Sequence, residues 1–166
     1  NLTGANLMGA NLMGANLMGA DVSHTDLTGV NLTDVNLTDV RLSDGNLTGT
    51  NLSGVKMTNA NLTNASLTGA NLTDAILAGI DLTGADLSGA NLEVARLEGT
   101  NLSGADLSGT FLGGVKFDGT DLSSANLTRA NVMKTKFARA NLAGADLTGL
   151  VPTGFGRGDS PESTSG

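Results

Sequence analysis

Apolar residues recur at every fifth position along almost the entire chain. Counted in steps of five from Leu2 to Leu147, this central position is apolar without interruption and is nearly always Leu. The exceptions to Leu are Val22, Met57, Phe117, Val132 and Phe137. Two residues earlier, the inner small position holds a small or β-branched residue such as Ala5 or Val30. Asn or Asp usually fills the polar position between them; Ser or Thr follows the centre at the hydroxyl position, and Gly often comes next at the corner position.

A period of five excludes both a helix and a straight strand. In a helix, five residues advance by about 140°, which scatters the leucines around the axis. In a strand, side chains alternate with a period of two, and five is odd. A short extended segment followed by a bend fits, because the bend resets the phase and Gly, Asn and Asp favour turns. Four such repeats close a square.

Successive squares then stack through parallel backbone ladders. About thirty repeats give about seven and a half coils and a rod roughly 36 Å long, since neighbouring coils lie about 4.8 Å apart. Leucines and inner small residues fill the interior, and residues twenty apart share one face of the rod. Threonines at the inner small position need backbone partners for their hydroxyls, because buried polar groups are hydrogen-bonded. They are Thr25, Thr50, Thr100, Thr110, Thr120 and Thr135.

Segments 5–9 (Ala-Asn-Leu-Met-Gly), 60–64 (Ala-Asn-Leu-Thr-Asn) and 85–89 (Ala-Asp-Leu-Ser-Gly) resemble repeats of the pentapeptide-repeat family. The resemblance implies an all-β fold, a right-handed quadrilateral parallel β-helix, over residues 1–150. The preference for right-handed crossovers points the same way. The resemblance also implies a source among cyanobacteria and chloroplasts, thylakoid-lumen members included.

Residues 151–166 are expected to form a cap and a flexible tail rich in Gly, Ser and Pro. Pro152 occupies a central position and cannot donate to a ladder, so the repeat stops there, and Leu150, Val151 and Phe155 are expected to cover this end. At the other end Asn1 starts inside a repeat. This suggests a trimmed chain or part of a longer one, with an open ladder that invites a partner or end-to-end self-association.

The amino-acid composition excludes several kinds of site and several classes of protein. There is no Trp, Tyr or Cys, so disulfides and thiolate zinc sites are excluded. The formal net charge of −7 argues against direct binding of nucleic acid, and no apolar run approaches the length of a membrane span. No signal peptide is expected from the pattern of the first residues. Frequent Asn-x-Ser/Thr sequons, as at Asn31 and Asn36, favour a bacterial cell or an organelle over the eukaryotic secretory pathway.

The period predicts which polar-position residues share a face. One column, the basic face, contains Asn16, Asn36, Lys56, Ile76, Arg96, Lys116 and Lys136, with Arg139 nearby. The opposite column, the acidic face, contains Asn6, Asp26, Asn46, Ser66, Asp86, Asp106, Asn126 and Asp146. The basic face is either a binding stripe or an ordinary solvated surface that Glu98 and Asp118 offset. Stacking Asp86 on Asp106 is expected to cost stability, because like charges then lie one ladder spacing apart.

Other candidate contact residues are apolar and point outward. Met8, Met13 and Met18 lie on three successive faces of the first coil, where they form either an adaptable contact surface or the trace of a triplicated repeat. Phe111, with Val94 and Ile76, forms a smaller apolar group. His24 is a lone histidine at a corner, which speaks against a metal site, and the tripeptide at 157–159, Arg-Gly-Asp, is a short motif that recurs by chance.

These observations favour a non-enzymatic scaffold that docks or spaces protein partners. No nucleophile–base pair, metal-ligand cluster or phosphate loop is recognisable, so neither catalysis nor a cofactor is expected. Coils without insertions predict flat faces and no pocket. The alternative is a DNA-mimicking inhibitor or protector of a type II topoisomerase, which the resemblance implies for some family members. Acidic residues occur on all four predicted faces, which speaks against it.

Overall fold

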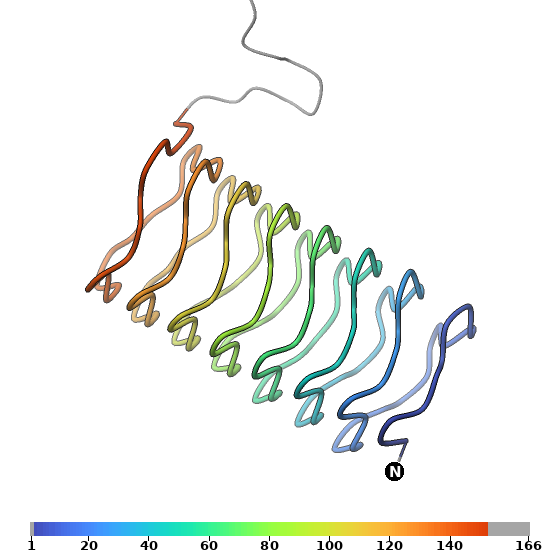
Figure 1. Cartoon of the computed structure of the whole chain (residues 1–166). Helices are drawn as coiled ribbons and strands as arrows, with labels where there is room; N and C mark the ends of the chain where they lie inside the picture. The colour runs from blue at the N-terminus through green and yellow to red at the C-terminus, as the bar shows by residue number, and fades with distance from the viewer. Residues whose placement is uncertain (1, 153–166) are drawn as a thin grey trace, which may run out of the picture.

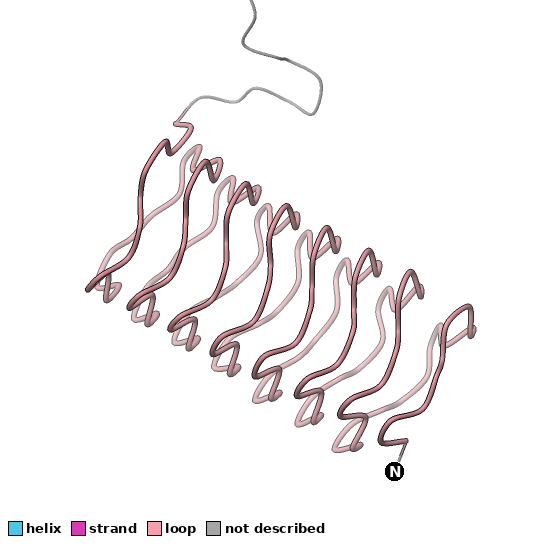
Figure 2. Cartoon of the chain, in the orientation of Figure 1, coloured by secondary structure: helices cyan, strands magenta, loops and turns pink. Residues whose placement is uncertain are grey.

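The computed structural model describes residues 2–152 as a straight stack of coils (Figure 1). No helix and no strand longer than one bridged residue occurs within these residues (Figure 2). Parallel bridges join polar-position residues twenty apart, from Asn6–Asp26 to Asn131–Val151. The predicted short strand on each side is thus reduced to one residue, because the turn occupies the rest of the repeat.

Backbone N–H groups pair both between coils and within each turn. In repeat 46–50, the N–H of Leu47 donates to the carbonyl of Ser66 in the next coil at 2.7 Å. The N–H of Asn46 donates to the carbonyl of Thr25 in the preceding coil at 3.0 Å. The N–H group of the corner residue also donates to the next coil. The N–H group of the residue that follows it, at the inner small position, closes the turn by donating to the carbonyl of the central residue. Because these donors are paired, the coil can be stable although each of its sides contains only one bridged residue.

The corner position sets the bend between two sides. Every described corner residue has a positive φ, between 54° and 73°. That conformation at the third residue of a turn favours Gly and is tolerated by Asn and Asp, as at Asp34 and Asn59. Val94, with a φ of 54°, is a β-branched residue in the same conformation and is strained.

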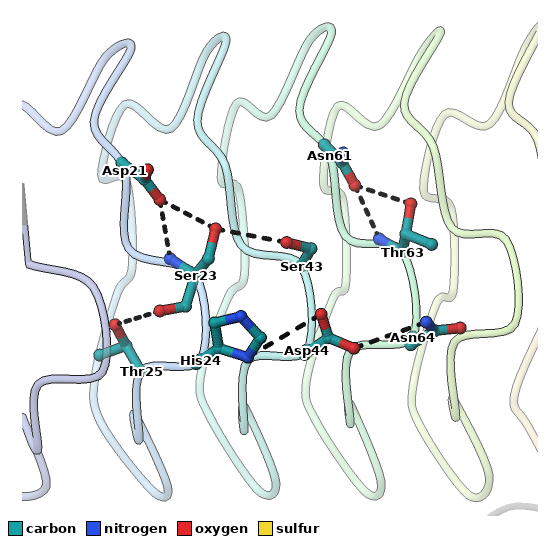
Figure 3. A network of polar contacts seen from close by, with 9 residues as sticks. All are labelled: Asp21, Ser23, His24, Thr25, Ser43, Asp44, Asn61, Thr63 and Asn64. Carbon is teal, nitrogen blue, oxygen red and sulfur yellow. Dashed lines mark hydrogen bonds and ion pairs between the residues drawn. The ribbon is translucent and has the colours of Figure 1, made fainter.

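The polar and hydroxyl positions lock the turn from outside. The Oδ1 atom of Asn61 accepts hydrogen bonds from the N–H and the Oγ1 of Thr63 at 2.9 and 2.7 Å, and Asp21 holds Ser23 in the same way (Figure 3). The hydroxyl-position N–H is the donor that no ladder reaches. The side chain of Asn or Asp therefore completes the backbone pairing, which explains its regular place in the repeat.

The interior is apolar and tightly filled. Leu47 and Leu87 are completely buried, and no volume that water could enter remains among the central residues from Met57 to Leu87. Each buried leucine contributes about 1.5–3 kcal/mol. The prediction for the buried threonines is confirmed, because each hydroxyl donates to a central carbonyl. Thr50 bonds Leu47 in its own turn at 2.7 Å, while Thr100 reaches Leu77 at 2.8 Å.

The coils at the two ends are less buried than those in the middle. Leu2 is 38% exposed and Leu147 is 40% exposed, because each lies in a coil that contacts only one neighbour. Asn11 makes no bridge, although Asn6 and Asn16 on either side of it do. Val151 continues the ladder onto Asn131. The expected covering residue Phe155 lies outside the described residues.

Candidate functional site

The predicted basic face is continuous in the structure. Parallel bridges connect each of its residues to the next, from Asn16–Asn36 through Arg96–Lys116 to Lys116–Lys136. Together with Arg139 at the neighbouring corner, the face holds five of the nine Lys and Arg residues of the chain. A protein of net charge −7 thus gathers most of its positive charge on one side.

Two acidic residues at hydroxyl positions partly neutralise the positive charge of this face. Asp118 accepts hydrogen bonds from Arg139, one of them from Nε at 2.7 Å, and this contact holds the pKa of Asp118 below its ordinary value. Glu98 Oε2 lies 3.8 Å from Arg96 Nε. Within residues 2–152, Lys56, Lys116 and Lys136 form no ion pair with an acidic residue. The positive charge of the face therefore remains accessible mainly along its lysines.

The acidic face stacks Asp86 on Asp106 as predicted, and the structure provides the reason that the sequence did not. Each carboxylate accepts the backbone N–H two residues on, at 2.9 and 2.8 Å, and therefore serves its own turn. Partial burial raises the pKa of Asp86, but hydrogen bonds from Ser88 and Thr68 outweigh it and lower the pKa overall. These donors, and the Asn126 amide that bonds Asp106, offset the repulsion between the two charges.

The expectation of flat faces without a pocket is wrong at one corner. A hollow of about 250 Å³ lies beside the basic face. It is lined by Val94, Ala95, Arg96, Glu98, Gly114 and Lys116. Sequence reasoning missed it, although a signal was present: the repeat departs from its usual residues at several neighbouring positions. Glu stands at two hydroxyl positions, Glu93 and Glu98, and the next coil carries adjacent glycines, Gly113 and Gly114.

The remaining candidates are dispersed over the rod. Met8, Met13 and Met18 are 58–63% exposed and surround the first coil, as expected. Ile76 is bridged to Arg96 on the basic face, but Phe111 bridges Asn91 on the preceding face. The predicted apolar group is therefore divided between two faces.

His24 has an acidic neighbour. Its Nδ1 lies 3.9 Å from Asp44 Oδ2, and Asp44 in turn contacts the amide of Asn64 along the same corner (Figure 3). No group of His, Cys, Asp and Glu that could hold a metal ion occurs in residues 2–152. No helix in this part of the chain has the length and apolarity to cross a membrane. The Arg-Gly-Asp tripeptide at 157–159 lies outside the described residues.

The fold defines the chain as a solenoid, a parallel β-helix with four five-residue sides per coil. The sequence model of pentapeptide repeats matches in eight copies over residues 1–34, 36–74, 65–104, 75–114 and 116–150. The chain belongs to the pentapeptide-repeat family, and its fold is the right-handed quadrilateral β-helix of that family. The resemblance read from the repeats is confirmed.

Several solved structures are similar. A pentapeptide repeat protein involved in heterocyst differentiation regulation, from the cyanobacterium Nostoc sp. strain PCC 7120, is 30% identical; the match covers 93% of this chain and 92% of that one, with a TM-score of 0.28. A protein from the Arabidopsis thaliana thylakoid lumen is 31% identical over 68% of each chain, with a TM-score of 0.31.

A third similar structure is QnrB1, a plasmid-mediated fluoroquinolone resistance protein. It is 20% identical over 87% of this chain and 83% of its own, with a TM-score of 0.43. At TM-scores below 0.5, these three similarities say nothing about what this chain binds. No curated protein matches the sequence.

Proposed function

We propose that the protein is a non-enzymatic scaffold that docks an acidic protein partner on its basic face. The observation that supports this most is the uneven distribution of positive charge. Lys56, Arg96, Lys116 and Lys136 follow one straight column, whereas the chain as a whole is acidic. Membership of a family whose proteins are generally structural or interaction modules agrees with this function.

A flat column of cations suits a protein surface better than a small molecule. The coil spacing of about 4.8 Å sets the spacing of Arg96, Lys116 and Lys136, and Ile76 leaves two coil spacings between Lys56 and Arg96. The ladder keeps the column straight, so the partner meets a surface that is already ordered and loses less entropy on binding. Complementary charge would raise the association rate more than the final affinity.

Capture of partners from an extract of the source organism tests the proposal. The bait is the full chain, and the test variant replaces Lys56, Lys116 and Lys136 with Asn, the usual residue of the polar position. The matched control replaces Asp86 and Asp106 with Asn on the acidic face. Loss of the captured protein with the first variant alone supports the basic face. Equal capture by both variants contradicts it.

The second candidate is a DNA-mimicking inhibitor or protector of a type II topoisomerase, favoured by the stacked carboxylates of Asp86 and Asp106. The magnitude of the charge argues against it. Residues 1–152 hold 14 Asp and Glu against 8 Lys and Arg, a net charge of −6; over a rod of roughly 36 Å this amounts to about one charge per 6 Å, against about one per 1.7 Å for B-DNA. A supercoiling assay with DNA gyrase decides between the two functions: we expect no inhibition, and potent inhibition would establish mimicry.

A further inference from the structure

The hollow beside Val94 combines two cations, one carboxylate and an apolar wall. Arg96 and Lys116 are consecutive members of the basic face, joined by a parallel bridge. Val94 and Ala95 form the apolar part, and Glu98 follows Arg96 by two residues in the same side. The Arg96 side chain is 62% exposed. A ligand therefore reaches the charged groups from solvent without any rearrangement of the backbone.

The hollow exists because the repeat departs from its usual residues on two successive coils. Gly114 carries no side chain, and a Cβ built there would lie 3.3 Å from Val94 Cγ1. Val94 itself adopts a φ of 54° that Gly, Asn or Asp would adopt at lower cost. A scaffold gains nothing in stability from Val at a strained, 55% exposed corner. The strain is a reason to look for a contact that uses this side chain.

Glu98 supplies an unused acceptor in the hollow. Its Oε2 atom is buried and accepts no hydrogen bond from residues 2–152. The nearest described cation, Arg96 Nε, is 3.8 Å away, which is too long for a hydrogen bond. A buried acceptor without a donor is unfavourable, because nothing compensates for the water that it has lost. The Glu98 side chain as a whole is 35% exposed, so rotation of its carboxylate would bring Oε2 to the N–H group of a ligand and pair it.

We propose that this hollow binds an acidic side chain of an extended peptide segment in the protein partner. The inference rests on the proposed docking function and names the point on the basic face where recognition is centred. Arg96 and Lys116 bind the carboxylate of the peptide, since a guanidinium and an ammonium together favour an anionic oxygen pair. Glu98 accepts a backbone N–H of the same segment, and Val94 packs against its aliphatic stem.

The carboxylate Glu98 selects against a phosphate group. A phosphate carries nearly two negative charges and offers no N–H donor, so it would leave Glu98 Oε2 unpaired and repel it. A peptide provides a single charge and a donor next to it. The groups that line the hollow therefore match an aspartate or glutamate in an extended chain.

Binding of a model peptide to the full chain tests this inference. The probe is an N-acetylated, C-amidated oligoglutamate, followed by chemical-shift changes of backbone amides in the ¹⁵N-labelled protein. We expect saturable shifts centred on residues 94–98 and 114–116. Oligolysine of the same length should produce none. Inorganic phosphate alone is the second control, and shifts equal to those of the peptide would overturn the assignment to a carboxylate.

Two variants separate the hollow from the face around it. Arg96→Asn should weaken peptide binding about tenfold or more, because hydrogen bonds to charged groups are strong. Asn is the usual polar-position residue, so the fold is retained. Lys56→Asn, two coils away on the same face, should have little effect. Equal loss with both variants overturns the hollow but leaves the basic face as the docking surface. No shift at any residue overturns both proposals.

Discussion

The corner conformation allows a reciprocal exchange of two residues to be predicted in sign and size. Val94 and Gly89 occupy successive corners, with φ of 54° and 63°. A non-Gly residue in this region costs about 1–2 kcal/mol, and glycine loses about 0.5–1 kcal/mol more entropy on folding. Val94→Gly should therefore stabilise the protein by about 0.5–1 kcal/mol. Gly89→Val should destabilise it by a similar amount, and no steric clash adds to this, since a Cβ at Gly89 meets nothing within 4 Å.

Urea denaturation followed by far-UV circular dichroism measures both variants. The two should differ by about 1–2 kcal/mol, and the double variant, which has the composition of the natural chain, should lie near the natural stability. Because the two corners lie on different edges of the rod, their effects should add. A destabilised Val94→Gly variant would refute the reasoning. It would mean that contacts of the Val94 side chain outweigh the backbone strain.

Three further predictions concern the core, the charges and the first coil. Leu87→Asn should lower stability by about 3–6 kcal/mol, since it loses the burial of Leu87 and buries an unpaired amide. Ser88→Thr, which keeps the hydroxyl that bonds Asp86, should stay within about 0.5 kcal/mol, and equal thermal midpoints of the two variants would contradict the inward and outward assignment. Hydrogen bonds from Arg41 and Ser23 lower the pKa of Asp21 to about 2, so its stabilising contribution should be complete above its unfolded pKa near 3.9 and vanish as pH falls through 2. Arg41→Gln should raise that pKa in a carboxyl NMR titration, and an unchanged value would rule out the ion pair. Replacing Met8, Met13 and Met18 with Lys should preserve the circular dichroism spectrum and weaken any association through the first coil, as measured by sedimentation; unaltered association would exclude the methionines as a contact surface.

The fold could be predicted from the sequence because every long-range contact in a solenoid is also periodic. The unbroken apolar period from Leu2 to Leu147 fixes which side chains face inward, and four sides per coil place residues twenty apart in one column. The basic face followed from this arithmetic. So did the burial of threonines such as Thr50, and the need of their hydroxyls for backbone partners.

The choices that depend on side-chain geometry were decided only by the tertiary structure. The five-residue period does not predict that the Arg139 side chain contacts Asp118. Nor does it predict that the Thr100 hydroxyl donates to the preceding coil, whereas the Thr50 hydroxyl donates within its own turn. Long and polar side chains choose among several partners at similar distances, and backbone register does not select one. The hollow arises because Gly114 lacks a side chain beside the strained Val94 of the coil before it. A cavity depends on the shapes of neighbouring side chains across coils, and these are set by packing in three dimensions and not by the order of residues in a repeat.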